Sequence, residues 1–168
     1  MGICGEKLMA FICSNEIPHM LTNKILLTVV AVMFCFSLNA QTISPIKWDY
    51  SIKKINKAEA MVCLHAKIDK GWRIYSQNVG DEGPIKTQFR FKSSNDYKLK
   101  GKTIEPEPIT KYSKAFDMNI SYFETEVTFM QRVRIKKYGA KITGYIKYMV
   151  ENENMSIPPD DVRFSITL

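Results

Sequence analysis

Apolar and polar residues alternate along most of the chain with a period of two. In the segment 47–55, KWDYSIKKI, the apolar side chains Trp48, Tyr50 and Ile52 are separated by polar ones. Successive side chains of a β-strand point to opposite faces of a sheet, so this alternation predicts a strand with one buried face. The same pattern predicts further strands over residues 60–68, 87–93, 120–136, 140–150 and 162–168.

Short clusters of Gly, Pro, Asn, Asp and Ser separate these segments, at residues 70–71, 80–84, 93–96 and 106–108. No segment keeps a helical apolar period for three turns. About eight short strands joined by such turns are typical of an antiparallel β-sandwich. The sequence therefore predicts an all-β fold, with a single sandwich over roughly residues 44–168.

The first 40 residues are expected to be an N-terminal extension followed by a signal peptide, not part of the fold, and the leader pattern begins at Met20. Lys24 precedes an apolar stretch over residues 25–36, and the small residues of SLNA follow it. This order predicts a secretory signal peptide with cleavage after Ala40, which leaves residues 41–168 as the mature domain. The apolar stretch is shorter than the roughly 20 residues that span a bilayer, so no transmembrane span is expected in the mature chain. Whether the leader starts at Met1 or at Met20 stays open.

Cys63 is the cysteine that remains after cleavage, because Cys4, Cys13 and Cys35 all precede Ala40. A domain with one thiol cannot form an internal disulfide. In the segment 60–68, Cys63 and His65 share the polar face of the predicted strand. We therefore expect Cys63 to be a half-buried strand thiol rather than a nucleophile.

The formal net charge is +7, and the two lysines of the leader are offset by its two glutamates. The mature domain is therefore basic, with its lysines and arginines spread along the strands as outward-facing residues. Such a surface is typical of a solvated sheet face, although attraction to an anionic membrane or polymer stays open. Nucleic acid is not an expected partner for an exported domain.

Residue patterns that carry catalysis or bind a metal are scarce in residues 41–168. One Cys and one His do not make a zinc site, and neither a nucleophile elbow nor a glycine-rich phosphate loop is present. No metal, cofactor or catalytic residue is assigned. Two carboxylate pairs could share acid/base work, but exposed pairs are more often only solvated. These pairs are Glu151 with Glu153 and Asp160 with Asp161.

Two aromatic clusters lie beside predicted turns. Trp72 and Tyr75 follow a Lys-Gly turn, and we expect Trp72 to be tucked against the core. The stretch 111–123, KYSKAFDMNISYF, is expected to be irregular and carries Phe116 and Met118. These two side chains could be tucked under the loop or held out as a contact surface.

Four segments follow one another in the order and spacing of a known module. They are IDKGWRIYSQ, GPIKTQF, EPEPITKYSKAFDMNISYFE and YMVENENMSIPPDDVRFSI. Together they resemble the N-terminal domain of the thiol:disulfide interchange protein DsbD, in its Bacteroidetes-type form, a disulfide bond corrector domain. The resemblance covers about Ile46 to Leu168.

The resemblance implies an immunoglobulin-like sandwich that passes electrons from a membrane-embedded partner to periplasmic thiol-disulfide proteins. In that family a cysteine pair ahead of an apolar residue and Pro-Pro performs the exchange, and a cap loop with a phenylalanine shields it. Here the pair falls on Glu151 and Ser156, ahead of Ile157, and Phe116 falls in the cap loop. Because exchange needs a thiolate and a resolving cysteine, the domain is expected to be redox-inactive.

We therefore expect a periplasmic or secreted binding module that docks a periplasmic or membrane-associated protein, for example one of a thiol-disulfide system. The expected contact residues are Phe116, Met118, Tyr148, Glu151, Ser156 and Ile157. Three alternatives stay open. One is a ligand or acid/base site rebuilt around Glu151 with Glu153 and Tyr148. The others are a residual thiol:disulfide interchange role in a larger system and a diverged relative with little activity.

Overall fold

The computed structural model describes residues 44–168, so the predicted signal peptide lies outside the described residues. Within this part of the chain every regular element is a strand, which confirms the all-β prediction, and no helix is present that could cross a membrane. The strands are β1 (Ile46–Lys54), β2 (Glu59–Ile68), β3 (Arg73–Tyr75), β4 (Gln88–Phe91), β5 (Tyr97–Ile104), β6 (Ile109–Ser113), β7 (Met118–Phe123), β8 (Glu126–Ile135), β9 (Lys141–Glu151) and β10 (Ser156–Thr167).

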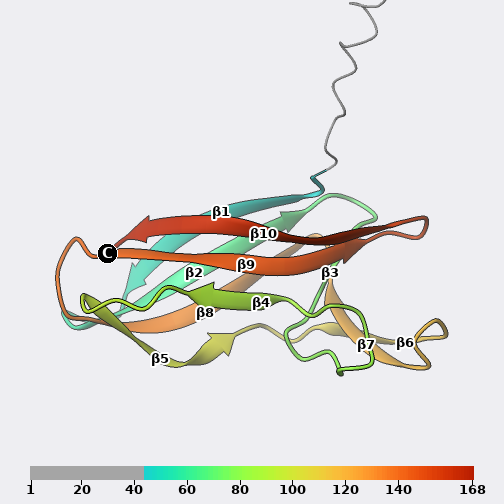
Figure 1. Cartoon of the computed structure of the whole chain (residues 1–168), viewed down its shortest axis with the longest axis horizontal. Helices are drawn as coiled ribbons and strands as arrows, with labels where there is room; N and C mark the ends of the chain where they lie inside the picture. The colour runs from blue at the N-terminus through green and yellow to red at the C-terminus, as the bar shows by residue number, and fades with distance from the viewer. Residues whose placement is uncertain (1–43) are drawn as a thin grey trace, which may run out of the picture. The chain divides into compact units, whose positions relative to one another are not determined.

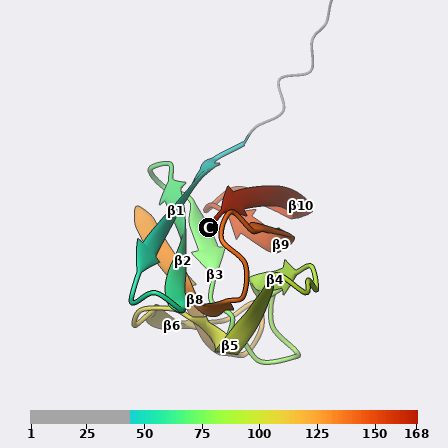
Figure 2. The ribbon, with the colours of Figure 1, turned by 90° about the vertical axis from the view of Figure 1, so that its left-hand side faces the viewer.

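The strands form two antiparallel sheets that face each other (Figures 1 and 2). The first sheet has the order β1-β2-β8-β5, and the second has the order β10-β9-β3-β7-β6, with β4 also paired to β9. The chain therefore folds as the predicted immunoglobulin-like antiparallel sandwich. Strand β9 runs almost the whole length of the second sheet, from Lys141 at one end of the sandwich to Glu151 at the other.

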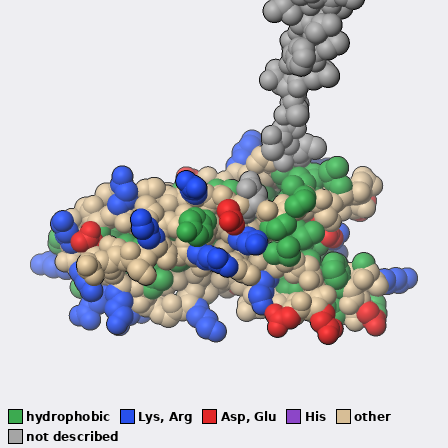
Figure 3. Space-filling view, in the orientation of Figure 1, with side chains coloured by type: hydrophobic (Ala, Val, Ile, Leu, Met, Phe, Trp, Pro, Cys, Tyr) green, Lys and Arg blue, Asp and Glu red, His purple; other side chains and the backbone are tan. Residues whose placement is uncertain are grey.

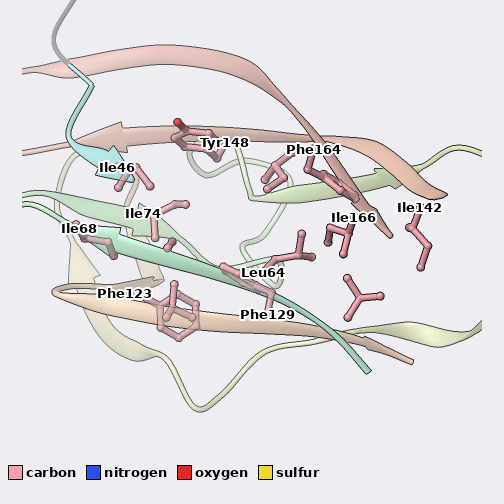
Figure 4. Packing of buried hydrophobic residues seen from close by; sticks show 14 of the residues in the cluster. Ile46, Leu64, Ile68, Ile74, Phe123, Phe129, Ile142, Tyr148, Phe164 and Ile166 are labelled. Carbon is pink, nitrogen blue, oxygen red and sulfur yellow. The ribbon is translucent and has the colours of Figure 1, made fainter. Parts of the chain in front are cut away.

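The core fills the space between the sheets and follows the period-two pattern. Strand β2 buries every second residue from Ala60 to Ile68, and β9 does the same from Ile142 to Val150. Figure 4 shows the inward side chains of the two sheets meeting. Phe129 lies at the centre and is fully buried, with its ring 4.7 Å from that of Phe89. Packing of these faces supplies most of the stabilising energy of such a fold.

The prediction of one strand over residues 120–136 is wrong, because the chain changes sheets in the middle. Strand β7 ends at Phe123 in the second sheet, and β8 begins at Glu126 in the first. Thr125 between them has a φ of 68°, a left-handed conformation that a β-branched residue rarely adopts. The Thr125 carbonyl accepts a hydrogen bond from the Ile68 backbone N–H at 2.7 Å, which holds the crossing point.

Other boundaries also differ from the sequence prediction. The last strand begins at Ser156 instead of residue 162, and its register against β9 shifts between Ile157 and Asp160, where two prolines cannot donate ladder hydrogen bonds. The stretch 111–123, expected to be irregular, belongs largely to the β6–β7 hairpin. Strands β3 and β6 were not predicted.

Candidate functional site

The two positions that the resemblance assigns to a cysteine pair face each other across the β9–β10 hairpin. Ser156 and Glu151 are the first register pair after its loop. The Asn152 side-chain oxygen closes this loop by accepting the backbone N–H groups of Asn154 and Met155, both at 2.8 Å. The Ser156 hydroxyl donates to Glu151 Oε2 at 3.4 Å. The hairpin therefore holds a carboxylate and a hydroxyl side by side.

Glu151 is held from the other side by strand β3. Arg73 pairs with Glu151 in the β3–β9 ladder, and its guanidinium lies 2.8 Å from Glu151 Oε1. The Arg73 guanidinium also lies over the ring of Tyr122, 5.3 Å from its centroid, where the ring face attracts a cation. The Glu151 side chain is 19% exposed, so this carboxylate is mostly buried, with its charge balanced by Arg73.

Tyr75 completes the cluster around Glu151. Burial, followed by a hydrogen bond to the Glu151 carboxylate, raises the pKa of the Tyr75 phenol well above its ordinary value, although the nearby Arg73 opposes the shift. The raised pKa means that the phenol keeps its proton at neutral pH and donates a hydrogen bond to the Glu151 carboxylate. The Glu151 carboxylate is therefore held by Arg73 and Tyr75 and is not part of a pair that exchanges a proton, although Arg73 Nε is buried without a hydrogen-bond partner.

We expect the Tyr75 ring to stay protonated in the folded protein at pH 10, where a free tyrosine is half ionised. The unfolded chain loses this proton above its ordinary pKa while the folded chain keeps it, so stability falls as the pH rises beyond about 10. NMR of carbon-13-labelled tyrosine follows each ring, and Tyr75→Phe assigns the resonance. Ionisation of Tyr75 with an unshifted midpoint would contradict the buried hydrogen bond to Glu151.

The β6–β7 hairpin stands beside this cluster. Its tip is closed by a hydrogen bond from the Tyr112 hydroxyl to the Asp117 carboxylate, and Asp117 has a φ of 52°, which an Asp tolerates better than most residues. Phe116 lies at this tip and is 37% exposed. Phe116 lines a cleft of about 240 Å³ whose other walls include Glu151, Arg73 and Tyr122. The cleft is thus aromatic at its rim and charged at its base.

A second small core supports the hairpin from below. Its buried members are Tyr75, Val79, Ile120 and Tyr122, and Met118 packs against them. A Cβ added at Gly80 would lie 2.7 Å from Met118 Cε, so the loop before β4 fits closely under the methionine. Met118 therefore supports the hairpin, whereas Phe116 is presented at the surface.

The structure brings some of the predicted contact residues together and separates others. Phe116 and Glu151 line one cleft, and Ser156 touches Glu151. Tyr148 is buried in the main core on the opposite face of β9, with its ring 5.5 Å from that of Trp48. Ile157 packs against that same core. Glu153 lines a different cleft with Trp72, so the trio of Glu151, Glu153 and Tyr148 is not assembled.

Arg73, Tyr75 and Tyr122 were not predicted as site residues. Arg73 and Tyr75 are two positions apart on one strand and so share a face, which is the signal that the sequence offers. Their partner Glu151 lies far along the chain, and strand pairing alone brings them together. Trp72 packs against the main core as expected.

Cys63 is half-buried on the outer face of the first sheet, between Ser51 on β1 and Met130 on β8 in the register. It does not line the cleft beside Glu151. Cys4, Cys13 and Cys35 lie outside the described residues. Within residues 44–168, no group of three His, Cys, Asp or Glu side chains is arranged to hold a metal ion.

The fold resembles solved structures of bacterial N-terminal domains. The reduced DsbD N-terminal domain of Neisseria meningitidis aligns with 15% identity and a TM-score of 0.53, covering 73% of this chain and 85% of that one. A structure of the complex between the DsbD and PilB N-terminal domains from N. meningitidis aligns with 15% identity and a TM-score of 0.51, covering 77% and 93%.

The N-terminal periplasmic domain of ScsB from Proteus mirabilis aligns with 15% identity and a TM-score of 0.53. That alignment covers 78% of this chain and 49% of the ScsB domain, so this chain corresponds to about half of it. No family profile matches the sequence, and no curated protein matches it. At this identity the similarity describes the fold, which is that of the DsbD N-terminal domain.

Proposed function

We propose that this protein is an exported, redox-inactive binding module that docks a periplasmic protein at the cleft between Phe116 and Glu151. The observation that carries the proposal is the exposed apolar rim around a carboxylate whose charge is already balanced. The rim includes Tyr112 and Phe116, which line the cleft and are both more than a third exposed. Ile109 on β6 and Met155 in the β9–β10 loop are further exposed apolar residues of the two hairpins that contribute Phe116 and Glu151. Figure 3 places hydrophobic side chains over this end of the molecule, where such a patch favours protein contact.

Redox inactivity is proposed from the chemistry of the two hairpin positions. Thiol-disulfide exchange needs a thiolate that attacks a sulfur and a second cysteine that resolves the mixed disulfide. Glu151 and Ser156 supply an ion-paired carboxylate and a hydroxyl, which can do neither. Cys63 lies on the other sheet and does not line the cleft.

The periplasmic location and the kind of partner are carried over from structures of similar fold. A DsbD N-terminal domain forms a complex with the PilB N-terminal domain, and the ScsB domain is periplasmic. We infer that the partner here is also a periplasmic or membrane-associated protein, for example one of a thiol-disulfide system. Docking through the hairpin end would then persist without electron transfer.

The arrangement of the cluster favours binding over an acid/base site. The carboxylate of Glu151 is engaged by Arg73, and the phenol of Tyr75 retains its proton. A general acid or base near neutral pH needs a group that exchanges its proton there, and these contacts do not supply one. Arginine and aromatic residues are instead enriched among the residues that contribute most to protein–protein binding, and here an Arg–carboxylate pair lies beside exposed aromatic side chains.

The experiment that tests the proposal is photo-crosslinking in the native periplasm with a reactive residue at position 116. A discrete protein adduct is expected from position 116 and not from position 51, because Ser51 is exposed on the outer face of the first sheet. Tyr112→Ala should reduce the adduct at least several-fold while the thermal midpoint changes little, since Tyr112 is 60% exposed. Glu151→Gln should reduce the adduct as well, but it leaves the Arg73 guanidinium unpaired and should also lower the thermal midpoint, so its adduct is measured where the variant is fully folded. Lys67→Gln, at an exposed strand position, is the matched control.

Two results would overturn the binding module. The first is an adduct of equal yield at positions 51 and 116, which indicates random encounter. The second is an unchanged adduct in both site variants. Insulin reduction by the purified protein would contradict redox inactivity separately, whatever the crosslinking result.

A further inference from the structure

The end of the sandwich opposite the candidate site is built from loops that are hydrogen-bonded to one another. The β1–β2 turn covers residues 55–58, and the β8–β9 turn covers residues 136–140. The Ile135 backbone N–H donates to the Ala58 carbonyl at 2.7 Å, and the Tyr138 hydroxyl donates to the Lys57 carbonyl at 3.1 Å. In the view of Figure 2 these loops face the reader, together with the β4–β5 loop. We call this end the basic tip.

Cationic side chains dominate the basic tip, and Figure 3 shows Lys and Arg gathered there while Asp and Glu lie mainly at the other end. The acidic side chains among these loops and strand ends are Asp96 and Glu59, and Glu59 pairs with Arg132. All the cations of the tip are exposed. They are Lys53, Lys54, Lys57, Lys92, Lys98, Arg134, Lys136, Lys137 and Lys141.

Two strands of the tip place like charges opposite each other. In the β5–β8 ladder Lys98 lies opposite Arg134, and Lys100 lies opposite Arg132, whose charge is partly balanced by Glu59. Like charges at directly opposed positions of an antiparallel pair destabilise a sheet. An opposing anionic surface would turn this repulsion into a favourable contact.

Apolar side chains stand out among the cations. Ile55 in the β1–β2 turn is 46% exposed, and Tyr138 in the β8–β9 turn is 68% exposed. The two turns are joined by the hydrogen bond from Tyr138 to the Lys57 carbonyl, so both side chains belong to one surface. This composition suits the headgroup region of a bilayer. Aromatic side chains are enriched at that depth, and lysines are attracted to the phosphates of anionic lipids.

We propose that the basic tip binds the surface of an anionic phospholipid membrane, with Tyr138 and Ile55 inserted among the headgroups. An acidic protein is the less suitable occupant, because protein interfaces are depleted in lysine at their centres and the tip is mostly lysine. The proposal is independent of the function proposed for the Phe116 cleft, although it fits with it. Strand β9 spans roughly 35 Å from Lys141 to Glu151, so the cleft would face away from the membrane.

The test measures binding of the protein to vesicles. The full chain is expressed with its own leader, and the exported form is purified and checked by intact mass. Sedimentation with vesicles containing one third phosphatidylglycerol in phosphatidylcholine should recover the protein, and phosphatidylcholine alone should not. Reversing three charges, with Lys57→Glu, Lys136→Glu and Lys137→Glu, should weaken partitioning at least about 100-fold, since each cation near an anionic surface contributes about five-fold.

Replacing the apolar pair, with Ile55→Ser and Tyr138→Ser, should weaken partitioning roughly ten-fold. The matched control, Lys70→Glu with Lys111→Glu and Lys114→Glu, also reverses three exposed lysines, all away from the basic tip, and should bind like the native protein. If this control lost as much vesicle binding as the tip variant, binding would depend only on the net charge of the protein, and the proposal would be overturned. A second result would also overturn the proposal: vesicle binding that does not change when the apolar pair is replaced and that equimolar inorganic polyphosphate abolishes. The tip would then be a binding site for free polyanions.

Discussion

Replacing both hairpin residues by cysteine, with Glu151→Cys and Ser156→Cys, is expected to create a disulfide as soon as the protein is oxidised. The two residues are a directly opposed pair of the β9–β10 ladder, and such pairs have Cα atoms about 4.5–5.5 Å apart. A disulfide accepts Cα separations of about 4.4–6.8 Å, with both side chains on one face. The variant is made in a Cys63→Ser background, so thiol titration and intact mass report on this pair alone.

The functional readout is disulfide exchange. The double-cysteine protein should reduce insulin in the presence of a dithiol, whereas the parent with Glu151 and Ser156 should not, because the missing sulfur atoms are the proposed reason for inactivity. A second opposed pair, Thr143→Cys with Ser165→Cys, lies in the same ladder but away from the β6–β7 hairpin that carries Phe116. It should form a disulfide and exchange more slowly. Failure of the two cysteines introduced at positions 151 and 156 to pair would contradict the register at the hairpin.

The strands that could be predicted from the sequence are those with one buried face and one exposed face. Strands β2 and β9 alternate buried and exposed residues over their whole lengths, so their period is visible. Strand β6 has almost no buried residue, and β3 has three residues, too few for a period. The break at Thr125 left no signal, because a threonine is an ordinary strand residue and only the change of sheet requires its left-handed φ.

For the candidate site, local sequence accounts for the hairpin and long-range pairing accounts for the rest. Glu151 and Ser156 are five positions apart and face each other through one loop. Arg73 and Tyr75 reach Glu151 only because β3 pairs with β9, and no local pattern reports that pairing. The burial of Tyr148 could have been predicted. It lies three positions from Glu151 on a strand, an odd spacing that puts the two side chains on opposite faces.

The largest loss of stability is expected from Phe129→Ala. Phe129 is fully buried, and its ring lies 5.8 Å from that of Phe123, 4.7 Å from that of Phe89 and 6.2 Å from that of Trp48. Truncation removes buried apolar surface and leaves a cavity between the sheets, which costs about 3–5 kcal/mol. Urea unfolding followed by tryptophan fluorescence should show a lower midpoint with little change in slope.

Tyr145→Ala is the matched control, because it truncates an aromatic residue of β9 that is 46% exposed and should change the free energy of unfolding by about 0.5 kcal/mol or less. A cost below about 1 kcal/mol for Phe129→Ala would contradict its place at the centre of the core. The two variants also separate stability from docking. Since Phe129 does not line the Phe116 cleft, its truncation should lower the yield of the crosslinked partner only by the fraction unfolded. A loss of crosslinking in fully folded Phe129→Ala would instead show that the core positions the hairpin for its partner.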